Sequence, residues 1–171
     1  MRFEKVKYEN FQKDVKKWLP IMHDARDSYL AKILNAVPIP KRGTKGSAGY
    51  DFSLPIDIKV HSGETVVVPS GIRAVFNEDE MDTWHLEIFV RSSVGIRKDT
   101  CIPNGTGIID ADYYRSENGG DILIALRNTG DHTVIFGAGE RVCQGIFKIH
   151  GLVEGDDTND CRKGGVGSTG K

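Results

Sequence analysis

Apolar residues recur at helical spacing over residues 8–37. Residues three and four positions apart share one face of a helix, so this spacing predicts two helices with a break at Pro20. Asp24 and Asp27 are the candidate caps of the second helix, and Pro38 closes it. We interpret the apolar stripes as packing surfaces. They consist of Phe11, Val15, Trp18 and Leu19 in the first helix and Tyr29, Leu30, Ile33 and Leu34 in the second.

Beyond Pro40 the pattern changes to short runs rich in β-branched residues, separated by turn residues at intervals of roughly ten positions. No helical pattern alternates with these runs, which disfavours a Rossmann or P-loop sheet. The spacing predicts an all-β sandwich, jelly roll or barrel. The runs are IDIKV, ETVVVP, GIRAVF, WHLEIFV, GIIDADY, DILIALRN, HTVIF and ERVCQGIFKI.

Length and charge exclude several classes of protein. The 171 residues, 39% of them hydrophobic, suit one domain with a sizeable core. A net charge of −1 gives no support for a DNA-binding protein. The longest apolar runs, such as Ile122–Leu126, are too short to span a bilayer, and the charged start lacks the apolar stretch of a signal peptide. We therefore expect a cytoplasmic protein that binds neither membrane nor nucleic acid.

The cysteines give no sign of a metal site. Cys101, Cys143 and Cys161 form no C-x-x-C pair, and the histidines are scattered along the chain. Neither residue type clusters at the spacing of metal ligands. We expect reduced, mostly packed thiols and no structural zinc.

The chain ends in KGGVGSTGK, of which Gly165–Lys171 fits the pattern G-x-x-x-x-G-K. A P-loop also needs a preceding strand, a following helix and a Ser or Thr after the Lys, and this stretch has none of them. Glycine-rich backbone still exposes N–H groups that bind anions, and Arg162 and Lys163 add charge. We expect a flexible arm that folds over a polyphosphate. The alternative is a tail without a role.

Four interior stretches carry side chains that complement such an arm. They are AGYDFS with Asp51, VRSSVGIR with Arg91, Ser92 and Ser93, NGTGIIDADYY with Asp110 and Asp112, and ERVCQG with Gln144. An arginine offers a bidentate fork to phosphate oxygens, and hydroxyls add short donors. Each stretch alone is equally typical of a turn, an edge strand or a solvated face. Asp110, between Ile109 and Ala111, is the most suggestive.

In this order, the four stretches and the glycine-rich tail resemble the five motifs of the trimeric all-β dUTPases. The resemblance covers about residues 37–170, and the order of the motifs makes it specific. It implies an all-β, jelly-roll-like barrel with a helical N-terminal extension and a flexible C-terminal arm. We place the extension at residues 1–37, the barrel at 38–154 and the arm, which closes the active site, at 155–171.

The resemblance also implies the reaction. The family hydrolyses dUTP to dUMP and pyrophosphate, which keeps uracil out of DNA and supplies dUMP for thymidylate synthesis. Water attacks the α-phosphorus, and Asp110 matches the carboxylate that acts as general base. Mg²⁺ is held by the triphosphate and water, with no direct protein ligand. The expected assembly is a homotrimer with active sites at the subunit interfaces, each closed by a neighbouring chain's arm.

By the same match, a β-hairpin over residues 104–113 reads uracil through main-chain groups and the Asn104 side chain. Such a site rejects cytosine because its donors and acceptors are mismatched. A narrow hairpin excludes the methyl group of thymine, and Tyr113 packs on the deoxyribose and leaves no room for a 2′-hydroxyl. The substrate-binding residues of this region are Asn104, Gly107, Ile108, Ile109 and Tyr113.

The remaining motifs match the phosphate-binding part of the family's site. Asp51 is expected to orient water or Arg91 rather than to touch the substrate. The expected phosphate contacts are Arg91, Ser92, Ser93 and Gln144. The expected contacts from the arm are Arg162, Val166, Gly167, Ser168 and Thr169.

Four features depart from the family pattern. Val166 stands where the family usually has a Phe that stacks on uracil, and the usual Arg of that motif falls opposite Cys161, one place before Arg162. The stretch after the hairpin, YYRSENGGD (113–121), is longer than the family's turn. The N-terminal helical region is also longer than in the simplest members, and we assign it to packing or to the trimer surface.

Three alternatives stay open at this point. A dCTP deaminase shares the fold and an R-S-S motif, but it needs a Glu where this chain has Ala125, and residues 122–128 contain no acid. A nucleotide sensor without turnover would keep the pocket, yet Asp110 and Arg91 are both present. A generic β-sandwich interaction module does not explain five ordered polar motifs.

Overall fold

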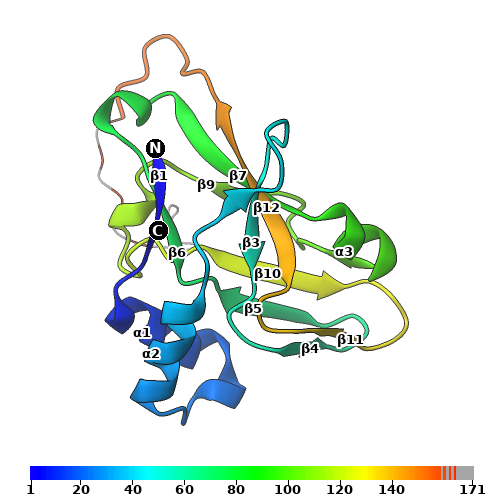
Figure 1. The fold of residues 1–171 in the computed structure, drawn as a ribbon. Helices are drawn as coiled ribbons and strands as arrows, with labels where there is room; N and C mark the ends of the chain where they lie inside the picture. Colours follow the sequence, from blue (N-terminus) through cyan, green and yellow to red (C-terminus); the bar gives the residue numbers. More distant parts are fainter. Residues whose placement is uncertain (159, 161, 163, 165–171) are drawn as a thin grey trace.

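Short antiparallel strands make up most of the computed structural model, which describes residues 1–158, 160, 162 and 164 (Figure 1). The strands coincide with β-branched runs, because Val, Ile and Thr side chains fit a pleated, half-buried surface. They are β1 (Arg2–Lys5), β2 (Lys41–Arg42), β3 (Tyr50–Ser53), β4 (Ile58–Val60), β5 (Thr65–Pro69), β6 (Ile72–Val75), β7 (Trp84–Val90), β8 (Thr100–Cys101), β9 (Gly107–Ile109), β10 (Leu123–Asn128), β11 (Val134–Phe136) and β12 (Arg141–Ile149).

The largest sheet has five strands in the order β2-β3-β12-β7-β9, and a second sheet has the order β5-β10-β8. Two further ladders pair β4 with β11 and β1 with β6. All the pairs between described strands are antiparallel. Most of them join strands that are distant in sequence, which is typical of jelly rolls and related barrels.

The N-terminal helices α1 (Tyr8–Trp18) and α2 (Asp27–Ala36) pack against one end of the sheets, with the short 3₁₀ turn η1 (Pro20–Met22) between them (Figure 1). Phe11 and Leu30 are fully buried, so most of each predicted apolar stripe is a packing surface, but Tyr29 is 54% exposed and Trp18 is only half-buried. Helix α1 lies beside β5. The extension is therefore attached to the barrel through its hydrophobic core.

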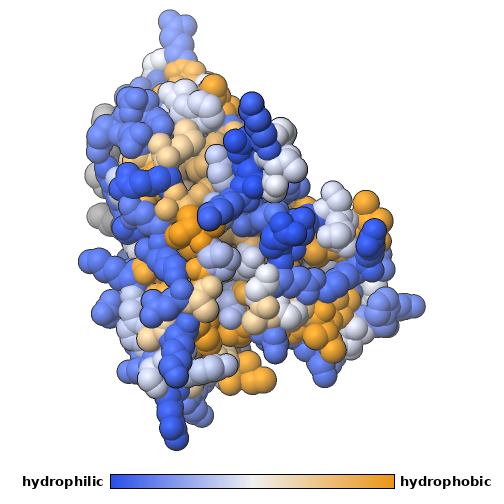
Figure 2. All heavy atoms as spheres, in the orientation of Figure 1, coloured by the Kyte–Doolittle hydropathy of each residue, from blue (hydrophilic) through white to orange (hydrophobic). Residues whose placement is uncertain are grey.

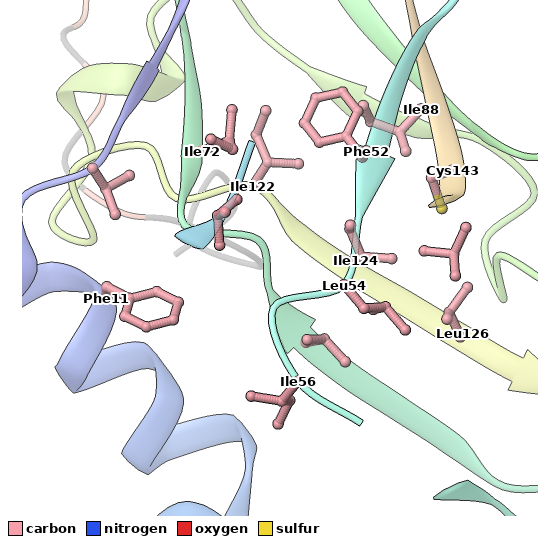
Figure 3. Close-up of a cluster of buried hydrophobic side chains, with 14 of the residues drawn as sticks. Phe11, Phe52, Leu54, Ile56, Ile72, Ile88, Ile122, Ile124, Leu126 and Cys143 are labelled. Carbon is pink, nitrogen blue, oxygen red and sulfur yellow. The ribbon is translucent and has the colours of Figure 1, made fainter. Parts of the chain in front are cut away.

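The core lies between the two sheets and continues to α1. Figure 3 shows Leu54, Ile124 and Leu126 close to Cys143, with Phe11 reaching the core from α1. Strand β10 alternates buried and more exposed residues, as expected for a strand with one face in the core. Burial raises the pKa of the Cys143 thiol to about 12, so this cysteine is an unreactive packing group.

The predominance of strands confirms the all-β class, and each of the eight predicted runs contains a strand. Four strands were not predicted: β1, β2, β3 and β8. Three of them are short, and β1 lies in the region predicted to be helical, where it pairs with β6 from Arg2↔Val75 to Lys5↔Ile72. Its four residues carry too little pattern to separate a strand from a helix.

One local prediction was wrong. GIIDADY is not one strand, because β9 ends at Ile109 and the chain turns into the 3₁₀ turn η3 (Tyr113–Arg115). The stretch after Arg91, for which no element was predicted, forms the short helix α3 (Ser92–Arg97). The extension, barrel and arm boundaries stay a prediction. Residues 159, 161, 163 and 165–171 of the arm lie outside the described residues.

Hydrophilic residues cover much of the face in Figure 2, with hydrophobic residues gathered in patches near its centre and lower part. None of the helices in the described ranges is long and apolar enough to cross a membrane.

A third 3₁₀ turn, η2 (Glu78–Glu80), precedes β7, and its residue Glu80 binds the N-terminal amino group at 2.6 Å.

We expect Gly71→Ala to lower the free energy of unfolding by about 2–3 kcal/mol. Gly71 has a φ of +71°, and a Cβ there would lie 2.8 Å from Leu34 Cδ1 of α2. Gly63→Ala is the matched control, because Gly63 has a φ of +74° but no atom within 4 Å of the added Cβ. Its expected loss is about 1 kcal/mol. If urea denaturation shows equal losses of unfolding free energy for Gly71→Ala and Gly63→Ala, a steric contact between residue 71 and α2 is contradicted.

Candidate functional site

The chain between β8 and β9 forms a tight turn at residues 102–106. The Gly105 N–H donates to the Ile102 carbonyl at 2.9 Å, and the Thr106 N–H donates to the Asn104 carbonyl at 3.0 Å. Gly105 has a φ of +80°, which a side chain would strain. Strand β9 then pairs with β7, from Ile88↔Gly107 to Leu86↔Ile109. The predicted hairpin therefore starts with this turn, and its strand β9 is attached to the five-stranded sheet through β7.

A cavity of about 450 Å³ opens between this hairpin and the edge of β10. Strand β8 pairs only with Arg127 and Asn128, so the hairpin departs from β10 before Ala125 and leaves a gap there. The lining is mostly apolar and includes the predicted nucleoside-binding residues Asn104, Gly107, Ile108, Ile109 and Tyr113, together with Asp110 and Leu123–Ala125. The cavity has room for a pyrimidine nucleoside.

Asp110 lies directly after β9, at the boundary between this cavity and a more polar one of about 600 Å³. The Arg162 side chain donates to Asp110 Oδ2 and, through Nε, to Asp112 Oδ1 at 2.8 Å. Its guanidinium also stands 5.7 Å from the centre of the Tyr113 ring. The Asp110 side chain is 52% exposed and therefore accessible to water and substrate.

Tyr113 is buried beneath the cavity and held by its hydroxyl group. The hydroxyl donates to the Asp121 carbonyl at 3.0 Å and accepts from Asn118 Nδ2 at 3.1 Å. Burial raises the pKa of Tyr113, and the Asn118 bond partly opposes this, so the phenol is protonated and can donate. Asn118 Nδ2 also donates to Asp14 Oδ2 of α1 at 3.1 Å. The long stretch after the hairpin therefore fixes the tyrosine ring.

The predicted phosphate-binding residues form a separate group at the end of β7. Arg91 Nε lies 3.0 Å from Asp51 Oδ1, and Arg141 Nη1 donates to Asp51 Oδ2 at 2.9 Å. Asp51 thus orients two guanidinium groups beside a hollow of about 410 Å³. Ser92 and Ser93 begin α3 and line the same hollow.

Gln144 of β12 also belongs to this group. Its side-chain amide has room there because the neighbouring residue is Gly49. A Cβ on Gly49 would stand 2.5 Å from Gln144 Oε1, so only glycine leaves room for the amide. Gln144 pairs with Asp51 of β3 and with Phe89 of β7 in the ladder. The pairing of three strands therefore places Gln144 next to Arg91 and Asp51.

The structure brings the predicted residues into two groups, not one. Asn104, Gly107–Ile109, Asp110, Tyr113 and Arg162 lie around the hairpin cavity, whereas Asp51, Arg91, Ser92, Ser93 and Gln144 line the hollow at the end of β7. The remaining predicted residues, Val166, Gly167, Ser168 and Thr169, lie outside the described residues.

Sequence reasoning gave no role to Arg141 or Asn118, and it named Asp112 only as part of a motif. Arg141 stands three residues from Gln144 inside a quoted motif, so its charge was the available signal. Asn118 offered no signal, because an asparagine in a polar loop is typical of a turn. Its role depends on tertiary contacts with Tyr113 and Asp14.

The family model described as dUTPase matches residues 35–170. The deoxyuridine 5′-triphosphate nucleotidohydrolase of Lactococcus lactis subsp. lactis is 37% identical over 145 residues, covering 82% of this chain and 94% of that protein. The crystal structure of dUTPase from Streptococcus mutans has a TM-score of 0.67 at 30% identity, covering 91% of this chain and all of that one.

A dUTPase structure from phage phi11 of S. aureus, described with a structural Mg(II) ion, has a TM-score of 0.59 at 18% identity. It covers 72% of this chain and 91% of that one, and it shows the same fold. The fold is that of the dUTPases. By the family match over most of its length, the chain belongs to the dUTPase family.

The buried carboxyl of Asp121 makes the free energy of unfolding depend on pH. Burial, followed by the charge of Asp14, raises its pKa well above 3.8, although the Gly71 N–H and the Ser70 hydroxyl donate to Oδ1. Among the described residues, Oδ2 has no hydrogen-bond partner. A raised pKa means that the folded state binds the proton more tightly, so this stabilisation is lost as pH rises above 3.8.

We therefore expect the stability of Asp121→Asn, relative to the unmutated protein, to increase as pH rises from about 4 to 7. The variant keeps the Oδ1 acceptor and removes the charge. Urea denaturation across this range gives the measurement. Gly63→Ala is the control, because it changes no titratable group and its added Cβ meets no atom within 4 Å, so its effect should not change with pH. If the difference in the free energy of unfolding between Asp121→Asn and the unmutated protein does not change with pH, a buried charge at Asp121 is contradicted.

Proposed function

We propose that this protein hydrolyses dUTP to dUMP and pyrophosphate, with the nucleoside in the hairpin cavity and the α-phosphate beside Asp110. The observation that carries the proposal is the position of Asp110 at the mouth of an apolar cavity of nucleoside size. The name of the Lactococcus lactis relative gives dUTP as the substrate of that protein. Hydrolysis of dUTP also fits the residues that line the cavity of this chain.

Uracil selection follows from the shape of the hairpin. Asn104 and Gly107 both line the cavity, so their amide donors and acceptors are in place before the base arrives. A base with a mismatched hydrogen-bonding edge would leave buried polar groups unpaired. The buried ring of Tyr113 supports the sugar and restricts space for a 2′-hydroxyl.

Asp110 acts as the general base. A carboxylate offers about four acceptor positions, so it can accept a bond from Arg162 and still orient a water molecule. The apolar residues on one side and the guanidinium on the other fix the direction of the carboxylate. The water loses its proton to Asp110 as it attacks the α-phosphorus, and pyrophosphate leaves.

Arg91, Ser92, Ser93 and Gln144 bind the phosphates, with Arg91 oriented by Asp51. Fixed donors of this kind stabilise charge that develops on phosphate oxygens. Arg162 adds a cation on the nucleoside side. The arm residues 166–169 complete the contacts in this proposal.

One chain does not supply both halves of the site. Leu86 of β7 pairs with Ile109, next to Asp110, whereas Arg91 follows the far end of the same strand. At ~3.3 Å per residue, these positions are roughly 16 Å apart along β7. One α-phosphate cannot contact both within a single subunit. We therefore infer a homotrimer in which Arg91 of one subunit serves the Asp110 of another.

Magnesium fits this site as part of the substrate. Within residues 1–158, 160, 162 and 164, no three His, Cys, Asp or Glu side chains are arranged to hold a metal ion. The carboxylates nearest the cavity, Asp110 and Asp112, already bind Arg162. We propose that Mg²⁺ is held by the triphosphate and water, where it offsets phosphate charge.

The cavity argues against the related deamination reaction. Ala125 lines it, at the position where a deaminase needs a glutamate, and the neighbouring residues Leu123 and Ile124 are apolar. No acid is therefore present on β10 to move protons at the base.

Asp110→Asn should lower kcat for dUTP at least about 1,000-fold, because the amide cannot accept the proton of the attacking water. Pyrophosphate release from dUTP, dCTP, dTTP and UTP with Mg²⁺ gives the measurement. Release from dUTP alone supports the assignment. Asp79→Asn, an exposed carboxylate distant in sequence, is the control and should keep full activity. Binding of dUTP without turnover by the unmutated protein would identify a sensor.

Shared sites predict complementation between inactive variants. Arg91→Ala and Asp110→Asn subunits are each expected to be inactive as homotrimers, but mixed trimers contain sites with both residues intact. Unfolding and refolding the two variants together should restore a measurable fraction of kcat, at most about a quarter for random mixing. Refolding each alone is the control. Absence of any recovery in trimers shown to be mixed would contradict sharing.

A further inference from the structure

The last residue of α1, Trp18, reaches the hairpin cavity from the N-terminal extension. Val15 on the same helix and Leu19 directly after it are buried and hold α1 against the barrel. Trp18 itself is half-buried and lines the cavity together with Val67 and Leu123. The extension thus supplies one wall of the candidate nucleoside pocket.

Trp18 and Tyr113 are the aromatic residues among those that line this cavity in the described part of the chain. Tyr113 is almost fully buried and its hydroxyl is bonded, so its position is fixed. Trp18 keeps part of its indole accessible, and the Lys17 ammonium stands 4.9 Å from the ring centre. The cation attracts the face of the indole ring.

The same helix also supports the tyrosine. Asp14 is four residues before Trp18 and therefore on the same side of α1. Its carboxylate accepts from Asn118, which in turn donates to the Tyr113 hydroxyl. Both aromatic walls of the cavity thus depend on the position of α1.

We propose that Trp18 contacts the pyrimidine nucleoside and contributes to its binding. The inference rests on the proposed placement of the nucleoside in the hairpin cavity. An apolar cavity bordered by a partly exposed indole suits a flat base, because aromatic faces stack on bases without needing a particular hydrogen-bond pattern. Trp18 is remote from the α-phosphate side of the site, so its contact stabilises the bound ground state and transition state equally.

The direct test labels the protein with 5-fluorotryptophan and titrates it with dUMP under ¹⁹F NMR. The chain has two tryptophans, Trp18 and Trp84, so two resonances are expected, and Trp18→Phe assigns them. The Trp18 resonance should shift and saturate at the dissociation constant measured by calorimetry, while the Trp84 resonance stays in place. An unmoved Trp18 resonance, with calorimetric binding intact, overturns the proposal.

Steady-state kinetics separate a substrate contact from a packing effect. Trp18→Ala should raise KM for dUTP and the dissociation constant of dUMP roughly ten-fold and leave kcat within about two-fold. Trp18→Phe keeps an aromatic face and should restore most of the affinity. Trp84→Ala is the matched control, because Trp84 is also partly buried and is not among the residues that line the cavity. An equal rise in KM for Trp84→Ala overturns the proposal.

Asn104→Ala distinguishes failure of this inference from failure of the underlying site. If Asn104→Ala weakens dUMP binding while Trp18→Ala does not, the hairpin site stands and the Trp18 contact is wrong. If Asn104→Ala leaves dUMP binding and KM unchanged, the nucleoside does not bind in the hairpin cavity, and both proposals fail.

Discussion

The ladder between β7 and β12 determines where the functional groups of this protein lie. It runs from Cys143↔Val90 to Ile149↔Trp84 and forms the centre of the five-stranded sheet. Arg91 leaves one end of β7, with Gln144 beside it on β12. Strand β9 pairs toward the other end of β7 and places Asp110 beyond Leu86. The strand that joins the two groups also keeps them apart, and this separation is the basis of the proposed assembly.

Sequence reasoning recovered the strands because their residues repeat a local pattern. It also singled out Asp110, Arg91 and Gln144 as candidate site residues, which stays a prediction. It could not place Arg91 and Asp110 in separate groups, since strand register is set by tertiary packing. Helix α3 was missed because its residues are few. Trp18 was interpreted as part of a packing stripe, and nothing in the spacing showed that the stripe ends beside a cavity.

The support for Tyr113 illustrates a compromise between stability and function. Asp14 and Asp121 are both buried carboxyls, and burial raises the pKa of each. A core of apolar residues would avoid the cost of desolvating them. The polar cluster instead holds the tyrosine hydroxyl through two directed bonds, which fix a ring more narrowly than apolar packing does.

The contact between Asp14 and Asn118 joins residues 104 positions apart. During synthesis, α1 emerges from the ribosome before β5 and Gly71, against which the helices pack, so the apolar face around Phe11 stays partly uncovered until those residues follow. The pocket wall that α1 provides is completed only when nearly the whole chain is available. The nascent chain therefore passes through a period in which its first helices are a natural target for chaperones.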